Sequence, residues 1–119
     1  MKYTFLFFSL FISFFTLADS QQEINHLLKF VETTSCSYER NGKQHTGQEA
    51  KEHIIKKYRY FIDDIESAED FIRLAATKST FSGKHYQVHC PNQASQTSKD
   101  WLTHELNQFR ATNKTSVEK

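Results

Sequence analysis

Residues 36–46, CSYERNGKQHT, decide how the middle of this chain folds. Asn41-Gly42 is a residue pair that type I′ two-residue turns prefer, because both residues tolerate a positive φ. Such a turn sets the register of the strands that it joins, so Tyr38 lies opposite His45. Alternation along the strands turns these two side chains to the same face. The stretch therefore predicts a β-hairpin with one inward face.

Helical patterns lie on both sides of the hairpin. Ser20–Glu23 (SQQE) has the form of a capping box, and apolar residues at helical spacing follow it, which predicts a helix over residues 21–33. Thr46–Glu49 (TGQE) is a second capping box at the start of another amphipathic helix. Ser67–Asp70 (SAED) indicates a further helix start, so we expect a bend near residues 63–67 and two separate helices. One long helix is the alternative.

The second half of the chain adds one strand and one helix. Residues 85–90 (HYQVHC) alternate as a strand with Tyr86 inward, and Thr97 or Ser98 caps a last helix. A disordered polar tail is expected over residues 111–119. Pairing the lone strand with the hairpin predicts an α+β domain, in which a three-stranded antiparallel sheet is covered by about four helices.

The two cysteines lie in different predicted strands, on the inward face of each. In an exported chain, Cys36 and Cys90 most simply form one disulfide, which closes a loop of about 55 residues. The chain-entropy treatment assigns to a loop of this length roughly 4 kcal/mol of stability. Two buried free thiols are the alternative.

The chain opens with a leader-like segment. Lys2 is followed by an apolar run that ends in small residues, which is typical of a signal peptide over residues 1–18 with cleavage near residues 18–20. The run is shorter than the roughly 20 residues of a membrane span, and an uncleaved anchor is the alternative. Cleavage predicts an exported protein with no remaining membrane span and a single domain over residues 19–110.

Charge disfavours one large class of functions. The formal net charge is +1, and removal of Lys2 with the leader makes basic and acidic residues equal in number. Nucleic-acid-binding proteins usually carry a strong basic excess, so we expect no nucleic-acid partner. The mixed run Lys56–Tyr60 (KKYRY) is expected to be a helix whose basic residues, Lys57 among them, face solvent.

The sequence shows no recognisable catalytic or metal-binding motif. His85 and His89 share a strand face, but at about 3.3 Å per residue their Cα atoms are about 13 Å apart, too far for one ion. His89 and Cys90 point to opposite faces, which disfavours a cysteine–histidine catalyst. The acidic run Asp63–Asp70 lacks the spacing of a calcium loop. We expect no catalytic residue, no metal and no cofactor.

One loop is a candidate binding site. Ser82–Tyr86 (SGKHY) is a Ser-Gly turn that leads into the late strand, and it is similar to the S-G-x-x-Y loop with which several families of bacterial lysozyme inhibitors plug the enzyme cleft. The resemblance assigns contacts to Ser82 and Tyr86, with Gly83 and Lys84 between them. Because Tyr86 alternates with inward strand residues, a core position fits it equally well.

A resemblance also covers nearly all of the predicted mature chain. The order of ERNG, EAKEH, SAEDFI, SGKHYQV with CP, and DWL, between residues 23 and 110, is similar to the YfeK-like family of small exported bacterial proteins, a domain of unknown function. The resemblance implies a Gram-negative periplasmic location and adds no catalytic residue. It also implies that the cysteine bridge is an accessory to the fold, because members with and without the pair occur.

Together these features predict a small periplasmic, non-enzymatic binding domain that docks an envelope protein or a peptidoglycan-related component. The candidate contact residues are the basic hairpin tip (Arg40, Asn41, Gly42, Lys43) and the loop Ser82–Lys84. Two other functions stay open. One is an inhibitor or immunity protein that blocks a lysozyme-type cell-wall hydrolase through this loop, and the other is an enzyme whose residues form no motif.

Overall fold

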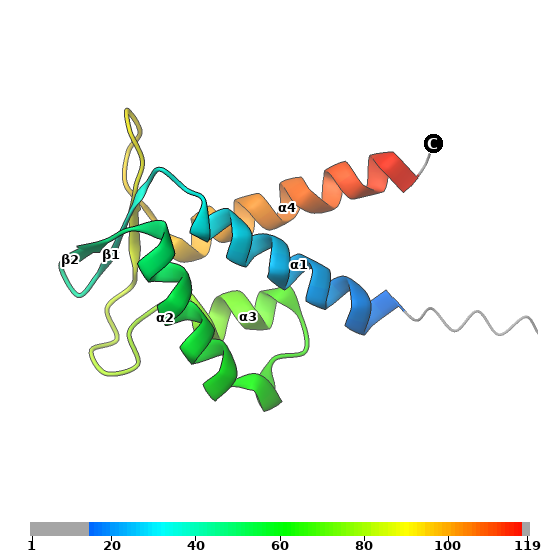
Figure 1. Cartoon of the computed structure of the whole chain (residues 1–119), viewed down its shortest axis with the longest axis horizontal. Helices are drawn as coiled ribbons and strands as arrows, with labels where there is room; N and C mark the ends of the chain where they lie inside the picture. Colours follow the sequence, from blue (N-terminus) through cyan, green and yellow to red (C-terminus); the bar gives the residue numbers. More distant parts are fainter. Residues whose placement is uncertain (1–14, 118–119) are drawn as a thin grey trace, which may run out of the picture.

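The computed structural model describes residues 15–117, and over this range it contains four α-helices, a short 3₁₀ helix and a four-stranded sheet. The elements follow in the order α1 (Phe15–Glu32), β1 (Ser37–Arg40), β2 (Lys43–His45), α2 (Gly47–Tyr60), η1 (Ile62–Asp64), α3 (Ala68–Ala75), β3 (Gln87–His89), β4 (Gln96–Thr97) and α4 (Ser98–Val117). The sheet lies at one end of the molecule, and α1 and α4 run side by side away from it (Figure 1). The predicted α+β class is confirmed.

The hairpin forms with the predicted turn and register. Asn41 and Gly42 have φ values of 52° and 81°, the positive values that a type I′ turn requires. Tyr38 pairs with His45, and the intervening pairs follow in step. This prediction needed only local information, because a two-residue turn leaves the flanking strands one register.

The sheet has one strand more than the sequence predicts. Its order is β2-β1-β3-β4, and every pair is antiparallel. The prediction of three strands was wrong because β4 has only two residues, Gln96 and Thr97, which is too short to show an alternating pattern. These residues pair with β3 and lead directly into α4.

The predicted disulfide forms. In the β1–β3 register Ser37 lies opposite His89, so the next pair outward is Cys36 with Cys90. Their Cα atoms are 4.3 Å apart, and the bond joins positions separated by 54 residues. The disulfide therefore ties the start of β1 to the end of β3.

The predicted N-terminal caps of the two helices on either side of the bend are confirmed. The Thr46 hydroxyl accepts from the Glu49 amide at 3.2 Å, and the Glu49 carboxylate accepts from the Thr46 amide at 2.9 Å, which completes the capping box of α2. The Ser67 hydroxyl accepts from the Asp70 amide at 3.1 Å at the start of α3. The two helices are separate, as the second cap predicts.

Both terminal helices are longer than predicted. Helix α1 begins at Phe15, so Ser20 lies inside it and the predicted cap there is wrong. Helix α4 continues to Val117, so the expected tail from Ala111 is helical as far as that residue. Neither segment contains a Gly or Pro that would interrupt a helix. Most of the predicted leader, residues 1–14, lies outside the described residues.

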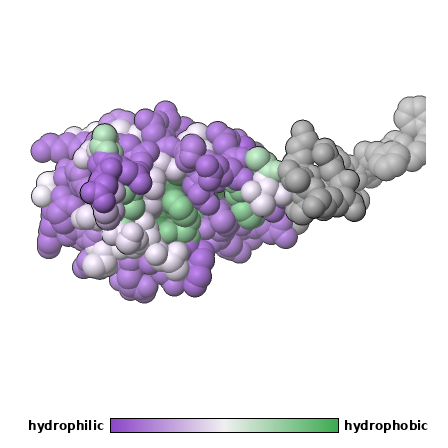
Figure 2. Space-filling model, turned by 90° about the horizontal axis from the view of Figure 1, so that it is seen from above, coloured by the Kyte–Doolittle hydropathy of each residue, from purple (hydrophilic) through white to green (hydrophobic). Residues whose placement is uncertain are grey.

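The core fills the space between the inner face of the sheet and the helices. Its buried side chains come from the four α-helices, from β1 and β3, and from the positions next to α3 and β3: Ile24, Leu27, Val31, Tyr38, Ala50, Ile54, Ala68, Phe71, Ile72, Ala75, Ala76, Tyr86, Val88, Trp101, Leu102 and Leu106. From above, the surface is mostly hydrophilic, with hydrophobic residues visible in a narrow central band (Figure 2). No helix within residues 15–117 is both long enough and apolar enough to cross a membrane.

Candidate functional site

The hairpin tip and the loop that precedes β3, two regions that the sequence treats separately, lie against each other. The Ser82 hydroxyl donates to Asn41 Oδ1 at 2.6 Å, and Asn41 Nδ2 donates to the Ser79 hydroxyl at 3.4 Å. Because Asn41 occupies the hairpin turn, these bonds hold the loop against the tip. We call the combined region, residues 40–43 and 81–84, the tip surface.

The loop of the tip surface is closed by its own backbone. The Ser79 amide donates to the Lys84 carbonyl at 2.9 Å, and the Gly83 amide donates to the Ser79 carbonyl at 3.0 Å. Gly83 has a φ of 73°, a conformation that glycine adopts without strain. Phe81 projects from this tight loop with its side chain fully exposed, at 102% of its reference area. Phe81 is the most exposed large hydrophobic side chain in the described part of the chain.

The candidate contact residues of the loop lie in different environments. The Ser82 hydroxyl is used internally, since it also accepts from the Lys84 amide at 3.2 Å. Tyr86 is only 1% exposed, so the contact role that the resemblance assigned to it is contradicted and the core alternative is confirmed. Arg40 is half-buried, while Asn41, Gly42, Lys43, Gly83 and Lys84 are exposed.

A hydrogen-bonded chain of polar side chains lies beneath the tip surface. A guanidinium nitrogen of Arg40 contacts His53 Nδ1 at 2.6 Å, and His53 Nε2 contacts the Tyr86 hydroxyl at 3.1 Å. Arginine only donates, so His53 Nδ1 accepts and its proton sits on Nε2. The Tyr86 oxygen therefore accepts from His53, and it also accepts from Lys57 Nζ at 3.3 Å.

The electrostatics of this chain follow from burial and like charge. Burial, and then the neighbouring cations Arg40 and Lys57, lower the pKa of His53 to about 4, which agrees with the neutral tautomer that the hydrogen bonds require. Burial, followed by Arg40, lowers the pKa of Lys57. Burial raises the pKa of the Tyr86 hydroxyl. The Nε atom of Arg40 is buried and has no hydrogen-bond partner in the described part of the chain.

Sequence reasoning missed this chain because it treated Lys57 as a solvated residue. Lys57 is half-buried, and its Nζ also donates to the Lys78 carbonyl at 2.6 Å. His53 and Lys57 are four residues apart on α2, so both point toward the same side. That spacing was the available signal, but nothing local shows that this side of the helix faces a buried tyrosine.

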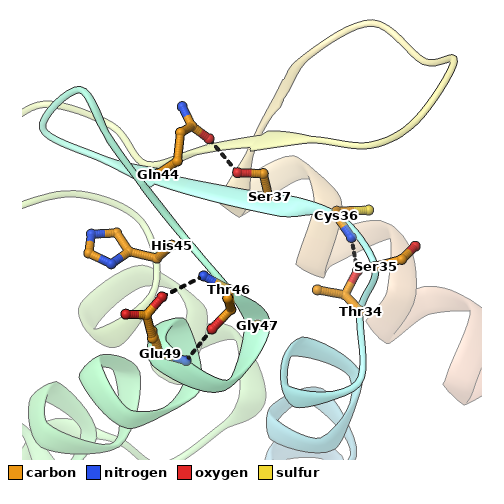
Figure 3. A pocket seen from close by; sticks show the side chains of 9 residues that line it. All are labelled: Thr34, Ser35, Cys36, Ser37, Gln44, His45, Thr46, Gly47 and Glu49. Carbon is orange, nitrogen blue, oxygen red and sulfur yellow. Dashed lines mark hydrogen bonds between the residues drawn. The ribbon is translucent and has the colours of Figure 1, made fainter.

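A hollow of about 380 Å³ lies between the hairpin and the start of α2 (Figure 3). Its polar groups are largely committed to each other: the Thr46–Glu49 capping box, the bond between Ser37 and Gln44, and the Cys36 amide, which donates to the Thr34 hydroxyl. The His45 ring and the Cys36 sulfur point in opposite directions, and this sulfur belongs to the disulfide. The hollow therefore offers no cysteine–histidine pair.

A serine, a histidine and a glutamate form another chain on the sheet. His89 Nδ1 lies 2.6 Å from the Ser95 hydroxyl, and His89 Nε2 lies 2.9 Å from a Glu39 carboxylate oxygen. The types of residue match those of a serine hydrolase, but none of the three lines the hollow at the hairpin, and Ser95 is exposed. Within residues 15–117, no group of three His, Cys, Asp or Glu side chains is placed to hold a metal ion. We assign this chain to bracing β1, β3 and the turn before β4.

Comparison with known proteins finds one family. Residues 18–110 match the sequence profile of a family of unknown function, DUF5329. No curated protein and no solved structure matches the chain.

Proposed function

The chain belongs to DUF5329, a family of unknown function, and on that premise we propose that it is a small exported, non-enzymatic binding domain. In this proposal it works in the periplasm and docks an anionic envelope protein or peptidoglycan-related component through the tip surface. Membership of the YfeK-like group is part of the same proposal.

The observation that carries the proposal is the meeting of the two candidate regions. The Ser82–Asn41 bond joins the hairpin turn, next to Lys43 in the chain, to the loop that carries Phe81 and Lys84, and these three side chains are exposed. Arginine, lysine and aromatic groups around one braced loop suit a partner that combines negative charge with an apolar patch.

The distribution of charge supports an anionic partner. None of Arg40, Lys43 and Lys84 forms an ion pair with a carboxylate of residues 15–117. By contrast, Arg110 is paired with both Glu23 and Glu69. Although the net charge is near zero, these cations at one end of the molecule are not paired with carboxylates.

The proposed export rests on three observations. The leader-like composition of residues 1–18 is typical of a signal peptide, and the family match starts at residue 18, where that leader would end. The disulfide is of the kind that persists in oxidising compartments. Intact-mass analysis of protein from the cell envelope tests this part, since a full-length chain with two alkylatable thiols would contradict it.

Crosslinked capture from envelope extracts tests the docking role. The wild-type protein is compared with Lys43→Gln/Lys84→Gln, which removes two exposed charges of the tip surface, and with Lys99→Gln, a matched control for an exposed lysine on α4. We expect one partner that wild type and the control capture and the double variant loses. Capture that is the same for all three proteins contradicts docking through the tip surface.

Phe81 favours a second candidate function, inhibition of a lysozyme-type hydrolase. A fully exposed aromatic side chain on a loop that is closed by its own hydrogen bonds has the shape needed to enter an enzyme cleft. In this version Phe81 and Lys84 make the contacts, because Tyr86 is buried. Stoichiometric loss of lysozyme activity, weakened by Phe81→Ala without a change in melting temperature, is the expected result. Full activity of several lysozyme classes in excess protein would contradict it.

A further inference from the structure

A hollow of about 250 Å³ lies behind the loop of the tip surface. It is enclosed by the end of α2, by α3 and by the loop, through Lys57, Phe61, Arg73, Leu74, Lys78, Ser79, Thr80 and Gly83. Its volume suits a small group rather than a whole cofactor, since binding sites for drug-sized ligands usually exceed about 300 Å³.

Three of the residues around this hollow are cationic. Lys57 and Lys78 form no ion pair with any carboxylate in the described chain, while Arg73 pairs with Asp70 at 3.2 Å. The two lysines are close enough for Lys78 to contribute to the lowered pKa of Lys57. One carboxylate against three cations leaves an excess of positive charge around the hollow.

Lys57 is held in place but not neutralised. Its ammonium group donates to the Lys78 carbonyl and to the Tyr86 hydroxyl, at 2.6 Å and 3.3 Å. An ammonium has three protons, so one donor remains, and Lys57 itself lines the hollow. Arg40, whose buried Nε has no partner, adds a further positive charge close by. A partly buried cation without an anion is costly, and a bound anion removes much of that cost.

The remaining walls decide what kind of anion fits. Phe61 and Leu74 supply half-buried apolar surface, so the ligand carries an apolar group next to its charge. Lysine ammonium groups act as point charges that reach an anion from separate directions, which suits a tetrahedral phosphate better than a planar carboxylate.

We propose that this hollow binds a phosphate ester, with the phosphate on Lys57 and Lys78 and the apolar substituent against Phe61 and Leu74. The inference rests on the proposed function, because it names the class of anion taken next to the tip surface. The phosphate can belong to a soluble ester or to a phospholipid headgroup, and both present the same chemistry to the two lysines.

Calorimetry on the mature protein tests the proposal with phenyl phosphate, inorganic phosphate, benzoate and phenol as probes. We expect phenyl phosphate to bind at least tenfold more tightly than any of the other three. Lys78→Gln changes an exposed side chain and leaves the bonds of Lys57 in place, so the fold is retained, and we expect it to raise the Kd for phenyl phosphate at least tenfold. Lys56→Gln, an exposed neighbour on α2 outside the hollow, leaves the Kd unchanged.

Three results would overturn the proposal: no binding of phenyl phosphate, equal binding of phenyl phosphate and benzoate, or the same Kd for Lys78→Gln and wild type. Equal binding of inorganic phosphate overturns the assignment of the apolar substituent to Phe61 and Leu74. Vesicles of phosphatidylglycerol in phosphatidylcholine identify the source: binding that Lys78→Gln abolishes supports a lipid headgroup, and phenyl phosphate binding without vesicle binding supports a soluble ester.

The docking proposal for the tip surface and the phosphate proposal for the hollow can be tested independently. Lys43→Gln/Lys84→Gln keeps both lysines of the hollow, so phenyl phosphate binds to it as to wild type even where partner capture is lost. If the docking proposal is wrong and the phosphate proposal is right, the double variant captures the same proteins as wild type, while Lys78→Gln still raises the Kd for phenyl phosphate. If the phosphate proposal is wrong and the docking proposal is right, the double variant loses the partner, while Lys78→Gln does not change the binding of phenyl phosphate.

Discussion

Adding one methyl group at Gly47 should lower the free energy of unfolding. It is the first residue of α2 and is buried against the end of α1. A Cβ atom at Gly47 would lie 2.2 Å from the Val31 carbonyl oxygen and 3.1 Å from the Glu32 carbonyl oxygen. Both contacts are with backbone, so no side chain can rotate away to relieve them.

The expected size of the effect follows from that geometry. Carbon–oxygen contacts are normally no shorter than about 3.3 Å, so in Gly47→Ala the two helices must separate by roughly 1 Å at this point. The Val31 carbonyl also accepts from the Thr34 amide at 3.3 Å, and the shift strains that bond. Overpacking of this kind typically costs about 1–3 kcal/mol. Helix propensity offsets little of this cost, because the advantage of alanine over glycine, about 1 kcal/mol, applies to a helix interior and Gly47 is the first residue of α2. We expect Gly47→Ala to lower the free energy of unfolding by about 2 kcal/mol.

Urea unfolding followed by circular dichroism measures the difference, and two other glycines serve as controls. Gly42 and Gly83 have φ values of +81° and +73°, and a Cβ at either would have no atom within 4 Å. Alanine at either position should lower the free energy of unfolding by about 1–2 kcal/mol, and only because its backbone must take a left-handed conformation. If Gly47→Ala is as stable as wild type or more so, helix propensity has prevailed and the close approach of α1 and α2 is wrong.

Three further predictions concern the disulfide, an ion-pair cluster and pH. Replacing both Cys36 and Cys90 by alanine should lower the free energy of unfolding by about 4 kcal/mol, from the chain-entropy cost of the 54-residue separation; equal midpoints in urea for the variant and the oxidised wild type would contradict this. Arg110→Met keeps the apolar stem but removes the bonds to Glu23 at 2.6 Å and 3.0 Å, so we expect a loss of about 1 kcal/mol at low salt that shrinks at high salt; a loss that is independent of salt would point to packing instead. The pKa of His53 is lowered to about 4 in the fold, so as the pH falls the unfolded chain takes up the proton before the folded chain does. The free energy of unfolding should therefore be constant above the ordinary histidine pKa of about 6.5 and should fall by up to about 1.4 kcal/mol per pH unit toward pH 4. His53→Gln should flatten that part of the profile, and an unchanged slope would show that other groups cause it.

Several elements could be predicted because their causes lie within a few adjacent residues. The Asn41-Gly42 turn sets the hairpin register, and a cap such as Thr46–Glu49 needs only four consecutive positions. The cysteine pair could be predicted although it joins distant positions, because the alternating pattern of each segment puts its cysteine on the inward face. Predictions failed where the local pattern was too short, as for β4, or where a plausible cap at Ser20 had helix on both sides.

The candidate site also has parts that could be predicted from local sequence and parts that could not. The sequence indicated the hairpin tip and the SGKHY loop as separate candidates, since each carries its own turn signal and basic residue. That Asn41 and Ser82 are bonded could not be read from either segment, because 41 residues separate them. The burial of Tyr86 was one of two alternatives at the sequence level, and only its contacts with His53 and Lys57 of α2 in the folded chain decided between them.

By itself the sequence determined the class of the fold, the hairpin and its register, the separation of α2 from α3, and the cysteine bridge. Each of these follows from turn chemistry, capping or the period of apolar residues, which act over a few positions. Only the tertiary structure decided that His53 and Lys57 face Tyr86, that the loop lies on the hairpin tip, and that cations without carboxylate partners gather around one hollow. Those relations depend on how whole helices pack on the sheet, and side chains far apart in the chain meet only after that packing has formed.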